Sequence, residues 1–383
     1  MSILRNEPTQ QAVQCACRAR DSRRIAADGW RLPALRCSTV PTQLLPAAVM
    51  PITTRRVGWR WQEAVELCVS PLPDDQRPEV ADELLRDARS GVTSLRPSRV
   101  VIENRTLLGC IIVAKQMDSS WLLQLPVVSE EVTDAECRDE IRRALVTDLA
   151  TDFDLSDSWI AQILLTHEQE SDSRFLTENG FPILTELSFM SATVSEHRPR
   201  PPEGELWQSD SWSESIRPRF DATITATYQG TLDCPELNGL RSEELALLGH
   251  EVSGPFQPDL WQIYSQAETD AGLILARCHS DESEPVFEIV YFGVTPPFRG
   301  RGLGQKMLAD LFAEAARQGV SEIMLAVDVR NAPAIRLYEQ SGFREFDRRQ
   351  VHARLGATRY GEPGESPPPA APCRLYISRP TFS

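Results

Sequence analysis

The sequence predicts an α/β protein made of two halves of similar design. Apolar segments of strand length alternate with stretches whose apolar residues recur at helical spacing. This order of elements occurs twice along the chain, and each half closes on a glycine-phenylalanine pair. The chain of 383 residues is long enough for two domains of ordinary size.

The composition excludes several classes of function. The formal net charge is −15, whereas a nucleic-acid-binding surface needs a basic face, so no nucleic-acid partner is expected. An acidic surface would suit an amine substrate. No apolar run reaches the length of a membrane span, and neither the nine cysteines nor the five histidines have the spacing of metal ligands. We therefore expect a cytoplasmic protein with reduced thiols, no membrane contact and no metal.

The first 49 residues differ from the rest of the chain. They hold seven arginines against three acids and show no periodicity. This pattern predicts a disordered extension, or translated sequence upstream of a start at Met50. An arginine-rich transit peptide is the alternative interpretation.

The remainder is expected to form two domains. The first is placed at 50–195 and the second at 206–383. Between them, residues 196–205 contain three prolines, which predicts an extended linker. Five prolines and three glycines within residues 356–372 predict a surface loop.

The two halves match in spacing as well as in order. Gly109 and Phe181 are 72 residues apart in the first half, and Gly272 and Phe343 are 71 residues apart in the second. Each half has a strand, a helix and a strand between these positions, expected at Trp121–Val128, Arg138–Leu149 and Trp159–Leu165, and at Val286–Val294, Gln305–Gln318 and Glu322–Val329. We interpret this as a tandem duplication whose two domains pair within one chain.

A glycine-rich turn follows the apolar strand of the second half. Its glycines allow positive φ angles, and a helix begins immediately after it. Unpaired amides at such a helix N-terminus favour a phosphate. A dinucleotide-binding fingerprint would need glycine where Gln305 stands, and a P-loop would need serine or threonine after Lys306, where Met307 stands. The turn therefore predicts a phosphate ligand other than these two classes of nucleotide.

Two motifs of the second half resemble the GNAT N-acetyltransferase superfamily. Arg299, Gly302 and Gly304 match its (Gln/Arg)-x-x-Gly-x-(Gly/Ala) turn. The stretch from Asn331 to Phe343 matches its Asn-x-x-Ala-x-x-x-Tyr-x-x-x-Gly-Phe segment at every specified position. The resemblance extends from about Gly272 to Arg354, and the tandem arrangement is similar to that of mycothiol synthase-like proteins.

The resemblance implies two tandem GNAT folds, each a mixed central β-sheet flanked by helices. It also implies that acetyl-CoA is the co-substrate and that the sheet of the second half splays open to admit it. Backbone amides of Phe292, Gly293 and Val294 would hold the pantetheine arm and polarise the thioester carbonyl. The residues that would cradle the pyrophosphate are Arg299, Gly300, Arg301, Gly302, Leu303 and Gly304. Asn331 would cap a helix and touch the cofactor.

The resemblance also implies direct attack by an amine on acetyl-CoA. Tyr338 would protonate the departing thiolate. Glu288 is the first candidate for the base that deprotonates the amine, Asp328 is the second, and a water chain is the third. The acceptor would be a small primary amine; a protein N-terminus or lysine, and a non-catalytic acyl-CoA-binding module, remain as alternatives.

The corresponding turn of the first half lacks these features. Residues 129–137 contain no glycine and four acids, which would repel a pyrophosphate. The position that matches Tyr338 is occupied by Leu176 or, nearby, Thr177. We therefore expect the first half to have the fold without the cofactor site, serving as a scaffold, a lid or part of the acceptor pocket.

Overall fold

A computed structural model describes residues 52–357 except 92, 197–205, 238, 241–246, 248–249, 252–255 and 280–284. The predicted extension at 1–49, most of the linker and residues 358–372 of the predicted loop lie outside the described residues. Contacts divide the chain into Met1–Met50 and Pro51–Ser383. All the elements described below belong to the second unit. Among its described helices, none combines the length and apolar composition that a membrane crossing needs.

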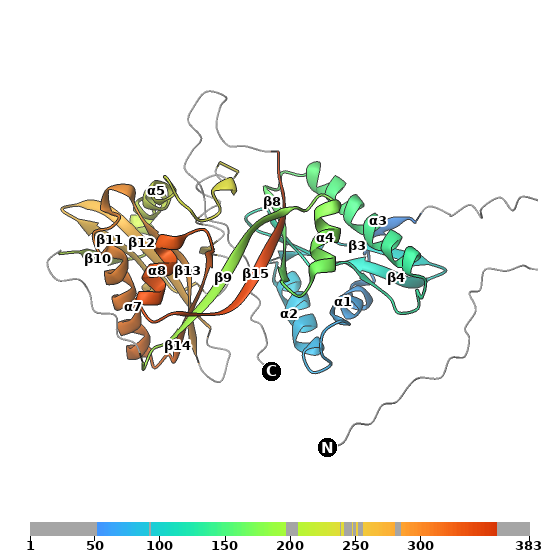
Figure 1. Cartoon of the computed structure of the whole chain (residues 1–383), viewed down its shortest axis with the longest axis horizontal. Helices are drawn as coiled ribbons and strands as arrows, with labels where there is room; N and C mark the ends of the chain where they lie inside the picture. Colours follow the sequence, from blue (N-terminus) through green and yellow to red (C-terminus); the bar gives the residue numbers. More distant parts are fainter. Residues whose placement is uncertain are drawn as a thin grey trace, which may run out of the picture. The chain divides into compact units, whose positions relative to one another are not determined.

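The second half forms a mixed sheet with helices beside it (Figure 1). Its elements are β10 (Gln208–Ser211), η1 (Glu214–Ile216), α5 (Arg217–Thr227), η2 (Pro235–Leu237), η3 (Pro258–Leu260), β11 (Trp261–Gln266), β12 (Thr269–His279), β13 (Val286–Val294), η4 (Pro296–Phe298), α7 (Leu303–Gln318), β14 (Glu322–Asp328), α8 (Ala332–Gln340) and β15 (Arg344–Leu355). Strands β10 to β13 are antiparallel, whereas β13 and β14 run parallel. The mixed α/β class predicted from the sequence is confirmed.

The parallel strands β13 and β14 separate part-way along. Val286 to Ile289 pair with Glu322 to Leu325, and no pairing continues beyond them. On the other side of β13, the register with β12 skips Val290, which is a β-bulge. A bulge bends its strand and increases the local twist. The separation of β13 from β14 therefore begins at the bulge and opens the sheet towards the end of both strands.

The first half has a related but less regular arrangement. Its elements are β1 (Thr54–Arg56), α1 (Trp61–Val69), α2 (Arg77–Ser90), β2 (Thr93–Ser94), β3 (Arg99–Glu103), β4 (Thr106–Ile111), β5 (Val113–Gln116), β6 (Ser120–Leu123), β7 (Val127–Val128), α3 (Ala135–Asp154), β8 (Ile160–Thr166), α4 (Glu170–Glu178) and β9 (Ile183–Thr193). The strand expected at Trp121–Val128 is broken into β6 and β7. Pro126 lies in the break and has no N–H to donate to a ladder.

One pair of glycines shows that the same packing occurs in both halves. Gly109 of β4 lies opposite Val128 of β7, and Gly272 of β12 lies opposite Val294 of β13. A Cβ atom on Gly109 would lie 2.7 Å from Cγ2 of Ile141, and one on Gly272 would lie 3.2 Å from Cδ2 of Leu303. In both halves, a helix after the neighbouring strand therefore packs on a glycine that leaves no room for a side chain.

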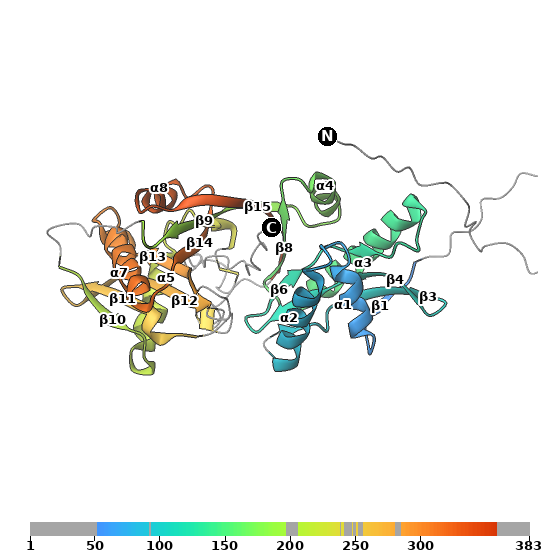
Figure 2. The ribbon, with the colours of Figure 1, turned by 90° about the horizontal axis from the view of Figure 1, so that it is seen from below.

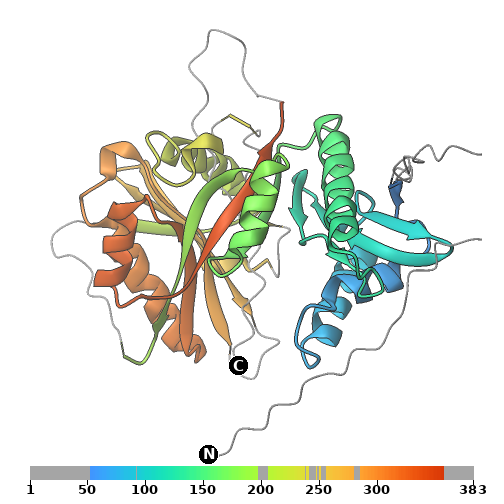
Figure 3. The same cartoon turned by 45° about the vertical axis from the view of Figure 1, so that its right-hand side comes forward.

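The last described strand of each half pairs with strands of the other half. Strand β9, from the first half, forms antiparallel pairs with β14 and β15. Strand β15, from the second half, pairs with β8. Figures 1, 2 and 3 show β9 and β15 side by side. The resulting sheet has the order β10-β11-β12-β13-β14-β9-β15-β8-β6-β5-β2, and a separate sheet has the order β1-β3-β4-β7. The division into domains at 50–195 and 206–383 remains a prediction.

Candidate active site

A cavity of about 580 Å³ lies where β13 and β14 separate. It is bounded by both strands, the N-terminus of α7, helix α8, and the end of α5 with the loop after it. Ten of the residues predicted for the cofactor or for catalysis line it: Phe292, Gly293, Val294, Arg299, Gly300, Gly302, Leu303, Gly304, Asn331 and Tyr338. Arg301, Glu288 and Asp328 do not.

The edge of β13 that faces the cavity carries backbone N–H groups. The N–H of Thr295 donates to the carbonyl of Ala271 in β12, at 2.8 Å. Successive N–H groups of a strand alternate between its two edges. The N–H groups of Phe292 and Val294 therefore lie on the opposite edge, beyond the point where β14 stops pairing. Two donors spaced along an open strand edge are suited to bind an extended chain that carries amide or thioester carbonyls.

The glycine-rich turn leads from β13 into α7. Gly300 and Gly302 have φ angles of 73° and 83°, in the left-handed region that favours glycine. Gly302 is the N-cap of α7, and no side chain caps the helix. The first amides of a helix have no acceptor in a preceding turn, and the helix dipole adds partial positive charge there. The turn is therefore suited to bind an anion such as a pyrophosphate.

The two arginine side chains of the turn make contacts within the protein. Arg299 donates to the carbonyls of Val294 at 3.0 Å and Thr227 at 2.8 Å, so its guanidinium joins the turn to the end of α5. Arg301 is exposed and lies over the ring of Phe298, with its guanidinium carbon 5.3 Å from the ring centre. The backbone amides at the start of α7 are donors that this turn offers to an anion.

Helix α8 contributes Asn331 and Tyr338 to the cavity. Asn331 caps the helix, since its side-chain oxygen accepts the N–H of Ala334 at 3.4 Å. Tyr338 is buried, with its ring centre 5.8 Å from that of Phe292 and 5.7 Å from that of Phe343. Burial, with a smaller contribution from the negative charge of Asp233, holds the pKa of Tyr338 well above its usual value. Its hydroxyl is therefore protonated at neutral pH.

Comparison with known families identifies this arrangement. The sequence profile of the Acetyltransferase (GNAT) family matches residues 258–343, which include β13, the turn, α7, β14 and α8. The chain contains a GNAT acetyltransferase domain. The predicted resemblance to this superfamily is confirmed.

Two curated relatives and one solved structure extend the comparison. A mycothiol acetyltransferase of Nocardiopsis dassonvillei is 29% identical over 168 residues, which are 40% of this chain and 50% of that protein. The chain thus spans about half the length of this relative. A mycothiol acetyltransferase of Kocuria rhizophila is 26% identical over 301 residues, which are 74% of this chain and 92% of that protein. A GCN5-related N-acetyltransferase of Sphaerobacter thermophilus shares the fold, with a TM-score of 0.54 and 17% sequence identity. The match covers 86% of this chain and 99% of that structure.

Glu288, the first candidate base of the GNAT domain, is buried outside the cavity wall. Its Oε2 atom accepts a hydrogen bond from Nε of Arg277 at 2.6 Å and lies 2.8 Å from Nε2 of His279. Arg277 stands directly opposite Glu288 in the β12–β13 register. The structure does not bring this carboxylate together with Tyr338 and the turn, and its role as a base remains a prediction.

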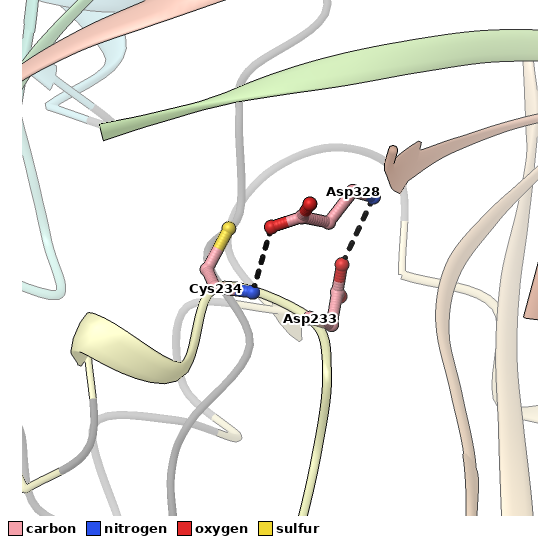
Figure 4. A group of neighbouring side chains, drawn as sticks. All are labelled: Asp233, Cys234 and Asp328. Atoms are coloured by element: carbon pink, nitrogen blue, oxygen red, sulfur yellow. Dashed lines mark hydrogen bonds between the residues drawn. The ribbon is translucent and has the colours of Figure 1, made fainter. Parts of the chain in front are cut away.

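Asp328, the second candidate, is fully buried at the end of β14. Its carboxylate accepts the backbone N–H of Cys234 at 3.1 Å and the guanidinium of Arg330 at 2.7 Å. Burial alone would raise its pKa, but the hydrogen bonds, chiefly those from Arg330, bring the pKa below its usual value. Asp328 therefore stays charged at neutral pH. Its hydrogen bond from Cys234 holds the loop before Cys234 against the sheet (Figure 4).

That loop supplies cavity residues that were not predicted. Helix α5 ends at Thr227. The segment after it lines the cavity with Thr227, Tyr228, Gly230, Thr231, Leu232 and Asp233. Among these, Asp233 carries a carboxylate. An acid in a loop has no pattern that marks it in the sequence, because only its contact with β14 brings it to the site.

The turn of the first half presents backbone hydrogen-bond acceptors, whereas the corresponding turn of the second half presents donors. Arg138 of α3 donates to the carbonyls of Ser129 at 2.9 Å, Val132 at 3.0 Å and Val128 at 3.3 Å. The turn thus directs backbone acceptors, rather than donors, at a guanidinium. Leu176, one of the two residues expected at the position of Tyr338, is buried in the core of this half. Both observations support the hypothesis that the first half lacks a cofactor site.

Proposed function

We propose that the protein is an acetyl-CoA-dependent N-acetyltransferase that transfers the acetyl group directly to a primary amine of a small molecule. One observation carries the proposal. A single cavity combines the open amide edge of β13, the glycine turn at the start of α7, and the protonated hydroxyl of Tyr338. These are the donors that a thioester, a pyrophosphate and a departing thiolate each need.

The residues of the cavity would act in the following order. The amides at the start of α7 bind the pyrophosphate, and the N–H groups of Phe292 and Val294 bind the pantetheine arm along the open edge. A strand-edge N–H close to the thioester carbonyl stabilises the charge that develops on its oxygen, an effect worth about 100- to 1,000-fold in rate for one donor. Tyr338 gives its proton to the sulfur as the carbon–sulfur bond breaks.

Two observations favour a small amine as the acceptor. The curated relatives are named mycothiol acetyltransferases, and mycothiol is not a protein. The net charge of −15 favours the approach of a cationic amine over that of an acidic peptide.

The proposal is tested by measuring CoA release from acetyl-CoA over a panel of small amines, polyamines, aminoglycosides and peptides. Mass spectrometry of each mixture should find an acetylated small amine, and the Gly302→Glu variant should give none. Acetylation of peptides alone would replace the small-molecule proposal with a protein acetyltransferase. Tight acetyl-CoA binding without turnover on any acceptor would favour the non-catalytic module.

A further inference from the structure

Asp233 is the one carboxylate in the cavity wall, among the residues that the structure describes. It lines the same cavity as Tyr338 and the β13 edge. Its Oδ1 atom accepts the backbone N–H of Asp328 at 3.1 Å. Within the described part of the chain, no donor is bonded to its other oxygen, Oδ2. The carboxylate is therefore held by one oxygen, and the other is available to a molecule in the cavity.

The loop that carries Asp233 is fixed in place on both sides of this residue. The N–H of Asp233 donates to Oγ1 of Thr231 at 3.1 Å. The N–H of Cys234 donates to Asp328 at 3.1 Å (Figure 4). Cys234 has a φ angle of 44°, a left-handed conformation that is uncommon for a residue other than glycine. Such strain persists only where the surrounding contacts hold it. The two bonds to Asp328 thus set the position of the Asp233 carboxylate.

The neighbouring charges leave Asp233 with little compensation. Arg330 is the nearby cation, and it is bonded to Asp328 at 2.7 Å and to Glu236 of η2 at 2.6 Å. Tyr338 of α8 lines the same cavity, and the negative charge of Asp233 contributes to the raised pKa of its hydroxyl. Burial, opposed by the N–H of Asp328 and supported by the charge of Asp328, raises the pKa of Asp233 to about 6. A carboxylate with such a pKa is charged at neutral pH and accepts a proton more readily than an ordinary aspartate.

We propose that Asp233 is the general base of the transfer, an assignment that rests on the proposed function. The acceptor enters as an ammonium ion, and Oδ2 of Asp233 takes one of its protons. The free amine then attacks the thioester carbon, so that a carbon–nitrogen bond forms and the carbon–sulfur bond breaks. Tyr338 protonates the sulfur and regains a proton from the acylated nitrogen. Asp233 finally releases its proton to solvent, leaving an amide, CoA thiol and one proton.

The test compares pH profiles of kcat for the wild-type protein and three variants. The wild-type rate should fall as the pH drops through about 6, because Asp233 becomes protonated. Asp233→Asn should lower kcat on the order of 100-fold and lose this acidic limb, with the Kd for acetyl-CoA unchanged. Asp233→Glu should restore part of the rate. Glu236→Gln replaces an acid of η2 that is outside the cavity wall, and its kcat should stay within about twofold of that of the wild type.

The outcomes separate this assignment from the proposed function. If the wild-type protein acetylates no amine, the proposed function fails first. If it is active and Asp233→Asn keeps both the rate and the acidic limb, only the assignment of Asp233 is overturned. In that case Glu288→Gln would be expected to remove the limb instead.

Discussion

At the scale of single residues, Tyr338 carries the clearest chemical prediction. The Tyr338→Phe variant keeps the ring that packs against Phe292 and Phe343 but loses the hydroxyl. We expect kcat to fall on the order of 100-fold, because the thiolate then leaves without a proton donor. Steady-state CoA release measures this loss, and calorimetry should find acetyl-CoA binding unchanged. An undiminished kcat would exclude Tyr338 as the acid.

Asp233 gives a second prediction at this scale, on stability. Its pKa is about 6 in the folded protein and about 3.9 in an unfolded chain. The folded state therefore binds the proton more tightly, and the resulting stability is complete below the unfolded pKa and lost as the pH rises through about 6. Asp233→Asn removes the buried charge, so its Tm should exceed that of wild type at about pH 7.5 and by less at about pH 4.

The measurement is a thermal unfolding series by circular dichroism at both pH values. An equal gain in Tm at both pH values, or a lower Tm of Asp233→Asn at about pH 7.5, would contradict the raised pKa of Asp233. The same series shows that a slow Asp233→Asn enzyme is folded.

Single residues were predictable from the sequence where a motif fixed them. Tyr338 and the turn glycines have a fixed spacing from a helix start, so their place at the cavity followed from local structure. The position of the Asp233 side chain depends on a hydrogen bond with Asp328, which is 95 residues away in the sequence. Glu288 depends on the register that sets Arg277 opposite it. Contacts of this kind are set by tertiary pairing and have no local pattern.

At the scale of elements, the two strand-to-helix turns explain why the halves differ. Arg138 satisfies three carbonyls of the first turn, whereas the second turn leaves its amides for an anion. Arg138→Ala should lower the free energy of unfolding by about 1–3 kcal/mol, because buried acceptors lose their donor. Urea unfolding measures this change. Arg138→Lys keeps the positive charge but loses the forked guanidinium, so its free energy of unfolding should lie between those of the wild type and Arg138→Ala.

Acetyl-CoA binding provides the contrasting readout for the same variants. Since Arg138 is not part of the cavity, its replacement should leave the Kd unchanged. A weakened Kd in Arg138→Ala would show that the first turn takes part in cofactor binding.

Element types were predictable because apolar periodicity is local, and one of the two breaks has a local signal that the expected strand ignored. The expected strand Trp121–Val128 contains Pro126, and the proline divides it into β6 and β7. The bulge at Val290 leaves no sign in an apolar run of strand residues. The first irregularity follows from the proline itself, whereas the second arises from how neighbouring strands pair and positions the cavity.

At the scale of the whole molecule, the exchange of β9 and β15 couples the two halves. Strand β9 covers the edge of β14, which is one wall of the cavity. A second half produced alone, as residues 206–383, would leave that edge unpaired, and unpaired edges favour aggregation. We expect this piece to be insoluble or weakly folded, and to recover when it is produced together with residues 1–205.

Size-exclusion chromatography and circular dichroism measure the result. As a control, the intact chain cut at a protease site inserted between residues 197 and 205 should elute as one species, because both strands are already paired. A separate second half that is monomeric, well folded and binds acetyl-CoA normally would contradict this account. The sequence predicted two halves, but β9 and β15 are both strands of similar length, and nothing in either one indicates which partner it takes.

The most direct test of the central claim is a calorimetric titration with acetyl-CoA. Gly300 in the turn and Gly319 at the far end of α7 both have a φ angle of 73° and open space where a Cβ would lie. Gly300→Glu and Gly319→Glu therefore impose the same backbone strain, but only the first adds a negative charge at the phosphate site.

The account predicts one acetyl-CoA per chain for wild type and for Gly319→Glu, and binding at least about tenfold weaker for Gly300→Glu. Two acetyl-CoA molecules per chain, or equal affinities for the two variants, would contradict it.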